Sequence, residues 1–117
     1  MKDNQLLTLS KAFAVNIVEL DAEIKRRGKS NAITSQLLRC GTSIGANIHE
    51  ANYAQSKADF ISKLQIALKE CYETDYWLDL FQTTSIITQE EFDAMSAGCN
   101  KIHRLLIASI KTAKDNI

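Results

Sequence analysis

Residues 37–51 read LLRCGTSIGANIHEA, with apolar residues at helical spacing and two glycines, Gly41 and Gly45, four residues apart. Each glycine inside a helix costs roughly 0.5–1 kcal/mol relative to alanine. The spacing puts both glycines on one helix face, where a neighbouring helix could come nearer than the usual separation of about 8–10 Å between axes. We therefore predict that the two glycines form a helix-contact strip.

Polar side chains run beside the glycines at positions i, i+4, i+8 and i+11 of the same helix. They are Arg39, Ser43, Asn47 and Glu50. We expect this line to meet Glu70, Glu73 or Asp75 of a later helix as a buried polar network that sets helix register or a subunit contact. The alternative is a solvated polar face. The candidate helix-contact and oligomer residues are Arg39, Gly41, Ser43, Gly45, Asn47, Glu50, Glu73, Tyr76 and Trp77.

Apolar residues spaced three and four apart predict four amphipathic helices along the chain. The first stripe covers residues 6–24, and its helix is expected to end before Gly28. The second helix is expected to start at Ser30 or Asn31 and to carry Ile33 on its apolar side. Ser56 with Asp59 and Thr88 with Glu91 predict the starts of the third and fourth helices. Short connections favour antiparallel neighbours, so we predict an all-α, up-down-up-down antiparallel four-helix bundle formed by residues 1–117 as one domain.

The chain has 117 residues, no proline and a formal net charge of zero, but its charges are segregated. Residues 25–69 hold eight basic and two acidic side chains, a net of +6, whereas residues 70–95 hold seven acidic and no basic ones, a net of −7. No apolar run approaches the roughly 20 residues that a membrane span needs, and no signal-peptide pattern is present. We therefore expect a cytoplasmic protein without a membrane partner, and its three cysteines are expected to be small apolar residues.

No motif predicts catalysis, a metal or a cofactor. Cys99 and His103 share a helix face at i and i+4, a spacing that could bind zinc, but no third ligand is indicated. Glu70 and Glu73 could do acid–base work, although such pairs on helices are usually solvated or ion-paired. The GTSIG segment lacks the lysine and the preceding strand of a phosphate-binding loop. The expectation is a protein that is not an enzyme, with no cofactor and no small-molecule substrate.

Three segments carry a resemblance to a known family: QLLRCGTSIGANIHEA (36–51), SKADFISKLQIALKE (56–70) and ETDYWLDL (73–80). They resemble the four helix bundle proteins whose founding members are encoded in intervening sequences of bacterial large-subunit ribosomal RNA genes, some of which are called ribosomal proteins. Cys40 departs from the serine of many relatives. The resemblance implies a homopentamer, and it extends to an accessory protein of diversity-generating retroelements that binds a reverse transcriptase and nucleic acid. It implies no catalytic residues.

Two functions remain open at this point. The first is a protein-interaction scaffold or adaptor whose segregated charges steer a subunit or a protein partner. The second is binding of RNA or DNA, ribosomal RNA included, through a basic rim at the end of the bundle where Lys2 and Lys11 oppose Asp3, Asp59 and Asp115. The candidate rim residues are Lys57, Lys63, Lys111 and Lys114. The other end is expected to gather seven acidic residues near the basic loop of residues 25–29: Glu70, Glu73, Asp75, Asp79, Glu90, Glu91 and Asp93.

Overall fold

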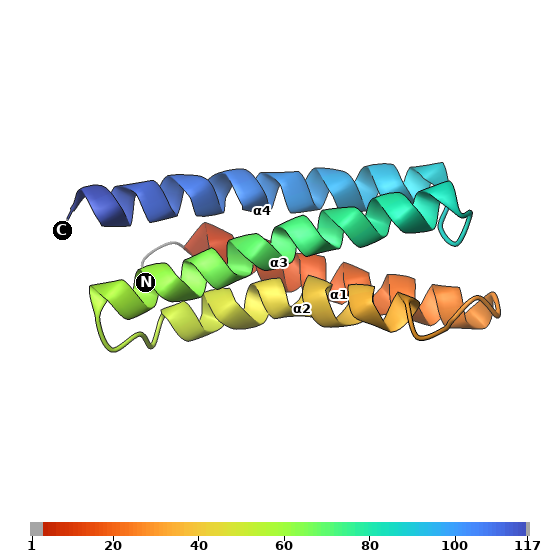
Figure 1. Cartoon of the computed structure of the whole chain (residues 1–117), viewed down its shortest axis with the longest axis horizontal. Coiled ribbons are helices and arrows are strands. Elements are labelled where there is room, and N and C mark those ends of the chain that lie inside the picture. Colours follow the sequence, from red (N-terminus) through yellow and green to blue (C-terminus); the bar gives the residue numbers. More distant parts are fainter. Residues whose placement is uncertain (1–3, 117) are drawn as a thin grey trace.

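The computed structural model describes residues 4–116 as four helices that pack along one another (Figure 1). They are α1 (Asn4–Arg26), α2 (Thr34–Ala51), α3 (Lys57–Thr83) and α4 (Gln89–Asp115). Consecutive helices run in opposite directions and contact each other, and α1 also contacts α4. The bundle measures 49 × 21 × 20 Å. The predicted all-α, up-down-up-down fold is therefore confirmed. Lys2 and Asp3, which we had assigned to one end of the bundle, lie outside the described residues.

The predicted apolar stripes form the core. Phe13 and Ile17 of α1, Ile44 of α2, Leu78 of α3 and Leu106 of α4 are buried, as the 3–4 spacing requires. Ile87, in the loop before α4, is buried with them. Burial of one such side chain contributes roughly 1.5–3 kcal/mol, so these stripes hold the four helices together.

The predicted start of α2 is wrong by three to four residues. The side chain of Asn31 accepts hydrogen bonds from the backbone N–H groups of Ile33 and Thr34, at 2.8 and 3.0 Å. Asn31, which we expected to cap the helix, instead forms this turn, so α2 begins at Thr34. As a result Ile33 is 48% exposed instead of lying on the apolar stripe, and Thr34 is buried in its place.

The other helix boundaries follow the predicted signals. The Ser56 side chain accepts from the Asp59 N–H at 3.0 Å, and Thr88 with Glu91 forms the complete capping box. Gly28 adopts φ +73° just beyond the end of α1, in the left-handed region that favours glycine. These turns bring the start of α1, the end of α2, the start of α3 and the end of α4 to one end of the molecule (Figure 1).

Candidate functional site

Both glycines of the opening stretch face α1. A Cβ atom built on Gly41 would lie 2.8 Å from Cγ1 and Cδ1 of Ile17, and one built on Gly45 would lie 3.3 Å from the backbone oxygen of Ser10. Ser10 is itself buried in this contact. A side chain at Gly41 would therefore displace Ile17, which explains why the helix carries glycine there despite its cost.

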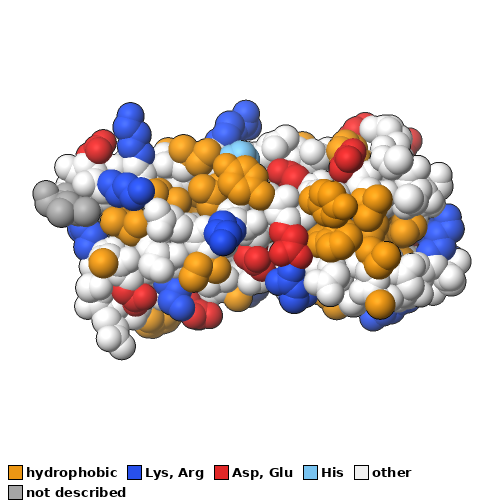
Figure 2. Space-filling view, in the orientation of Figure 1, with side chains coloured by type: hydrophobic (Ala, Val, Ile, Leu, Met, Phe, Trp, Pro, Cys, Tyr) orange, Lys and Arg blue, Asp and Glu red, His pale blue; other side chains and the backbone are white. Residues whose placement is uncertain are grey.

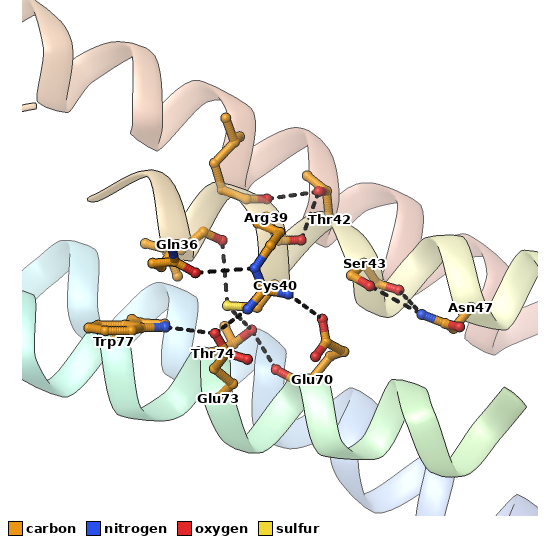
Figure 3. A network of polar contacts seen from close by, with 12 residues as sticks. Gln36, Arg39, Cys40, Thr42, Ser43, Asn47, Glu70, Glu73, Thr74 and Trp77 are labelled. Atoms are coloured by element: carbon orange, nitrogen blue, oxygen red, sulfur yellow. Dashed lines mark hydrogen bonds and ion pairs between the residues drawn. The ribbon is translucent and has the colours of Figure 1, made fainter. Parts of the chain in front are cut away.

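Arg39 joins α2 to α3 (Figure 3). Its guanidinium contacts the carboxylates of Glu70, at 3.1 Å, and Glu73, and its Nε donates to the Gln36 side chain at 3.2 Å. The indole N–H of Trp77 donates to the same Glu73 oxygen at 3.0 Å. The hydrogen bond from Arg39, with that from Trp77, holds the pKa of Glu73 below its usual value. The carboxylate therefore stays ionised and fixes both of its donors.

This Arg39 network is not buried, which corrects our expectation. The Arg39 side chain is 50% exposed, and its two carboxylate partners are partly exposed. Asp75 does not take part, because it lies on the side of α3 that faces α4, near Cys99 and His103. The reason is helical geometry: Glu70 and Glu73 flank the α2 side of α3, whereas Asp75 follows about 200° further round the helix than Glu73.

The rest of the polar line does not extend the network. Asn47 donates to the backbone oxygen of Ser43 at 2.9 Å and to its hydroxyl at 3.1 Å, both within α2. Glu50 is paired with Lys63 of α3 at 3.1 Å. The line therefore divides into three parts: the Arg39 ion pairs with α3 and the local Ser43–Asn47 bonds, both drawn in Figure 3, and the separate Glu50–Lys63 ion pair.

Beneath Arg39 lies a buried polar contact that the sequence did not single out. The Thr74 hydroxyl donates to the Glu70 backbone oxygen at 2.8 Å and lies 3.3 Å from the Cys40 sulfur. Burial raises the pKa of the Cys40 thiol to about 11. Cys40 is therefore a neutral, small side chain in the α2–α3 contact, as we expected of the cysteines from the sequence.

The outer side of α3 carries large side chains that nothing in the described chain covers. Tyr76 is 61% exposed, and its ring lies 5.1 Å from that of the half-buried Trp77. Tyr72, one turn earlier, is 49% exposed. Leu80, one turn later, is partly buried. Figure 2 shows orange hydrophobic groups over this part of the molecule, beside acidic groups. We call Tyr76, Trp77 and Leu80 the α3 aromatic face.

Tyr72 also pairs with a side chain of α4. Its hydroxyl lies 3.1 Å from Nε2 of His103, and the two rings meet edge to face with centroids 4.9 Å apart. The sequence suggested His103 only as a possible zinc ligand beside Cys99. Its spacing from Tyr72 in the sequence gives no signal of this contact, since the partners lie on different helices.

The four candidate rim lysines have unequal surroundings. Lys57 donates to the backbone oxygen of Asn116 at 3.1 Å, and Lys63 is paired with Glu50. Lys111 and Lys114 instead border an open groove of about 370 Å³ between α3 and α4. Two of the four lysines thus have partners on neighbouring elements, and the other two border the groove between α3 and α4.

At the opposite end, the basic loop meets Glu91 as expected, whereas Glu70 and Glu73 pair with Arg39 instead. Arg27 pairs with Glu91 through two hydrogen bonds, one of them 2.9 Å long, and with Glu23 at 3.0 Å. Lys29 donates to the backbone oxygen of Ser85 at 2.6 Å. The hydrogen bonds from Arg27 are the main reason why the pKa of Glu91 is lowered. These contacts tie the end of α1 to the loop and helix that follow α3.

Within residues 4–116, no group of three or more histidine, cysteine, aspartate or glutamate side chains is arranged to hold a metal ion. The Cys99 sulfur instead donates to the backbone oxygen of Cys71 at 3.6 Å. None of the four described helices is long and apolar enough to cross a membrane.

A family model described as 23S rRNA-intervening sequence protein matches residues 2–108. The chain belongs to this family. A crystal structure of a protein of unknown function from the S23 ribosomal protein family of Bacteroides thetaiotaomicron is 48% identical in sequence, with a TM-score of 0.88 over 91% of this chain and 98% of that chain. A search of curated proteins gives no match. The family resemblance stated from the sequence is thereby confirmed, and the related S23-family protein shares this helical fold.

Proposed function

We propose that this member of the intervening-sequence family is a non-enzymatic, self-associating bundle that serves as a protein-interaction scaffold or adaptor. The observation that supports the proposal is the α3 aromatic face, where Tyr76 is mostly exposed beside Trp77. Exposed groups of large apolar side chains are typical of protein interfaces, and tyrosine, tryptophan and arginine are enriched in their centres.

The Arg39 network suits an interface next to this face. Glu70 and Glu73 hold the guanidinium in place, yet half of the Arg39 side chain remains exposed. An arginine that is already oriented loses less conformational freedom when it pairs with a second protein. The proposal therefore places Arg39, Glu73, Tyr76 and Trp77 at a contact between copies of the chain, with five copies as the resemblance implies.

The same proposal includes a cytoplasmic location, a further protein partner for the assembled ring and no small-molecule substrate. The location is supported by the family's description, which refers to 23S ribosomal RNA. The three buried, unpaired cysteines are compatible with a reducing compartment.

Sedimentation velocity of two tyrosine variants tests the proposal. Tyr76→Ser removes an exposed ring from the α3 aromatic face, and Tyr53→Ser removes a 75% exposed ring elsewhere. We expect Tyr76→Ser to sediment as a smaller species and Tyr53→Ser to match the unaltered chain. Equal sedimentation of all three proteins would show that the α3 aromatic face is not the contact.

A second candidate function is binding of RNA or DNA by the basic side chains, which the pair Lys111 and Lys114 at the α3–α4 groove favours. Phosphate contacts of this kind weaken as salt rises, because they release counterions. The test is the fluorescence anisotropy of a labelled RNA at low salt. Alanine at Lys57, Lys63, Lys111 and Lys114 together should abolish the shift, and an unchanged shift would exclude these lysines.

A further inference from the structure

We propose that the seam between α3 and α4 is a binding site for single-stranded nucleic acid, in which a base stacks on Tyr72 beside His103 while Arg104, Lys111 and Lys114 contact the phosphates. The proposal rests on the second candidate function. It extends the site from the end of the bundle along the seam toward Tyr72 and His103, and it adds an aromatic side chain that the lysine rim lacks.

The aromatic component is the pair Tyr72 and His103. Tyr72 is 49% exposed, and its ring is held by the 3.1 Å contact of its hydroxyl with Nε2 of His103 and by the edge-to-face packing of the two rings. A ring that is fixed and half-exposed can receive a base with little further ordering. Every base has an aromatic face, so stacking of this kind tolerates different sequences.

The basic component lies on the same side of α4. At 100° per residue, Arg104, Lys111 and Lys114 fall within about 100° of His103 around the helix axis, on the exposed side that borders α3. Arg104 and both lysines are exposed. The lysines border the groove of about 370 Å³, which Ile107 and Leu68 also line. Figure 2 shows basic side chains over the half of α4 nearest its C-terminus, above the orange groups of α3.

The acidic side chains near this seam are few. Asp115 lines the groove next to the lysines. Asp75 lies close to His103 and is partly buried. Glu70 and Glu73 lie on the α2 side of α3, where Arg39 occupies them. Lys69, one turn before Tyr72, is exposed and adds a further positive charge. The seam therefore has a net positive charge, in contrast with the acidic opposite end.

The dimensions suit a short single strand. Arg104 and Lys114 are ten residues apart, which corresponds to about 15 Å along the helix. A row of cations of this length beside an aromatic ring is the arrangement that single-strand-binding proteins use, with site sizes of about 4–16 nucleotides. A double helix keeps its bases stacked inside and could use the cations alone, so the tyrosine favours the single strand.

Fluorescence anisotropy of labelled oligouridine and oligothymidine of about 12 nucleotides tests the proposal. Tyr72→Leu keeps an apolar side chain and removes the ring, so we expect about tenfold weaker binding with an unchanged salt dependence. The triple variant Arg104→Gln, Lys111→Gln, Lys114→Gln should lower the slope of log affinity against log salt by about 2, at about 0.7 per phosphate contact. Tyr53→Leu and Lys101→Gln are the matched controls and should bind like the unaltered chain.

The outcomes separate this proposal from the function on which it rests. Binding of either oligonucleotide with both predicted variant effects supports it. If only the double variant Lys57→Gln, Lys63→Gln lost binding, the protein would bind nucleic acid but the seam would not be the site. Equal affinity for a duplex would contradict the stacking role of Tyr72. Absence of binding to any probe at low salt would overturn both. Circular dichroism confirms that each variant is folded.

Discussion

The guanidinium of Arg39 on α2 lies 3.1 Å from the Glu70 carboxylate on α3 and also contacts Glu73. Because the arginine is half-exposed, water screens these pairs, and they stabilise the single bundle only slightly. We expect Arg39→Ala to change the free energy of unfolding by less than about 1 kcal/mol, measured by urea denaturation. The same variant should reduce self-association, because Arg39 belongs to the proposed contact.

Arg39→Lys is the matched control, since it keeps the charge but cannot contact both carboxylates with a planar fork. We expect it to retain the stability of the unaltered chain and to recover only part of its self-association. A loss of several kcal/mol in Arg39→Ala, with unchanged assembly, would instead assign Arg39 to the stability of the single bundle.

Gly41→Ala should destabilise the bundle. The new Cβ would lie 2.8 Å from two carbons of Ile17, so the isoleucine must move, at a cost of about 1–3 kcal/mol that the higher helix propensity of alanine offsets only in part. Thermal and urea unfolding measure the loss. In an Ile17→Ala background those carbons are absent, so Gly41→Ala should then be neutral or stabilising.

This double-mutant cycle isolates the contact between the two residues. If Gly41→Ala costs as much with Ile17→Ala as without it, the glycine is needed for another reason than close approach of α1.

Acid should weaken the bundle at the end where Arg27 lies. Hydrogen bonds from Arg26 and, to a lesser extent, Arg27 lower the pKa of Glu23 from 4.5 to about 2. The hydrogen bonds from Arg27 also lower the pKa of Glu91. A carboxyl whose pKa is lower in the folded state stabilises the fold above its unfolded pKa and loses this contribution as pH falls through the folded pKa. Stability should therefore fall from about pH 5 towards about pH 2, as urea midpoints at several pH values would measure.

Arg27→Gln removes the charge shared by Glu23 and Glu91, so its stability should depend less on pH over that range. Asp75 acts in the opposite sense, because burial raises its pKa and protonation then favours the folded state. An acid dependence in Arg27→Gln as steep as that of the unaltered chain would contradict the role assigned to Arg27.

All three thiols should resist modification in the folded protein. Cys40, Cys71 and Cys99 are buried and unpaired. Burial raises the pKa of Cys40 to about 11, and the hydrogen-bonded contact with Cys71, with burial, raises that of Cys99 further. A thiol reagent at about pH 8 attacks the thiolate, so we expect no fast reaction when folded and three equivalents after denaturation. Rapid labelling of the folded chain would contradict this packing.

The fold was predictable because local signals and the apolar pattern agree. The capping residues Ser56 and Thr88 and the apolar stripe around Ile17 each predicted an element that the structure contains. The start of α2 failed because Asn31, a good helix cap, also forms a turn with its own backbone neighbours. A single sequence does not indicate which of these two local bonds is formed.

The interaction surfaces were less predictable, because they depend on which helix faces meet. Gly41 and Gly45 were correctly placed on a helix contact, but the sequence could not assign that contact to α1. The pair Tyr72 and His103 was missed, since 31 residues separate them in the sequence. Lys63 was assigned to a free basic rim, yet it is paired with Glu50 across two helices. Such pairings become visible only when the register between helices is known.

Self-association is the central claim, and the mass of the unaltered chain in solution tests it most directly. Multi-angle light scattering, coupled to gel filtration, measures that mass without assuming a shape, which matters for an elongated molecule of 49 × 21 × 20 Å. The proposal predicts a discrete mass that is a multiple of 13.1 kDa, close to five times that value, and unchanged on dilution. A mass of 13.1 kDa at every concentration would contradict it.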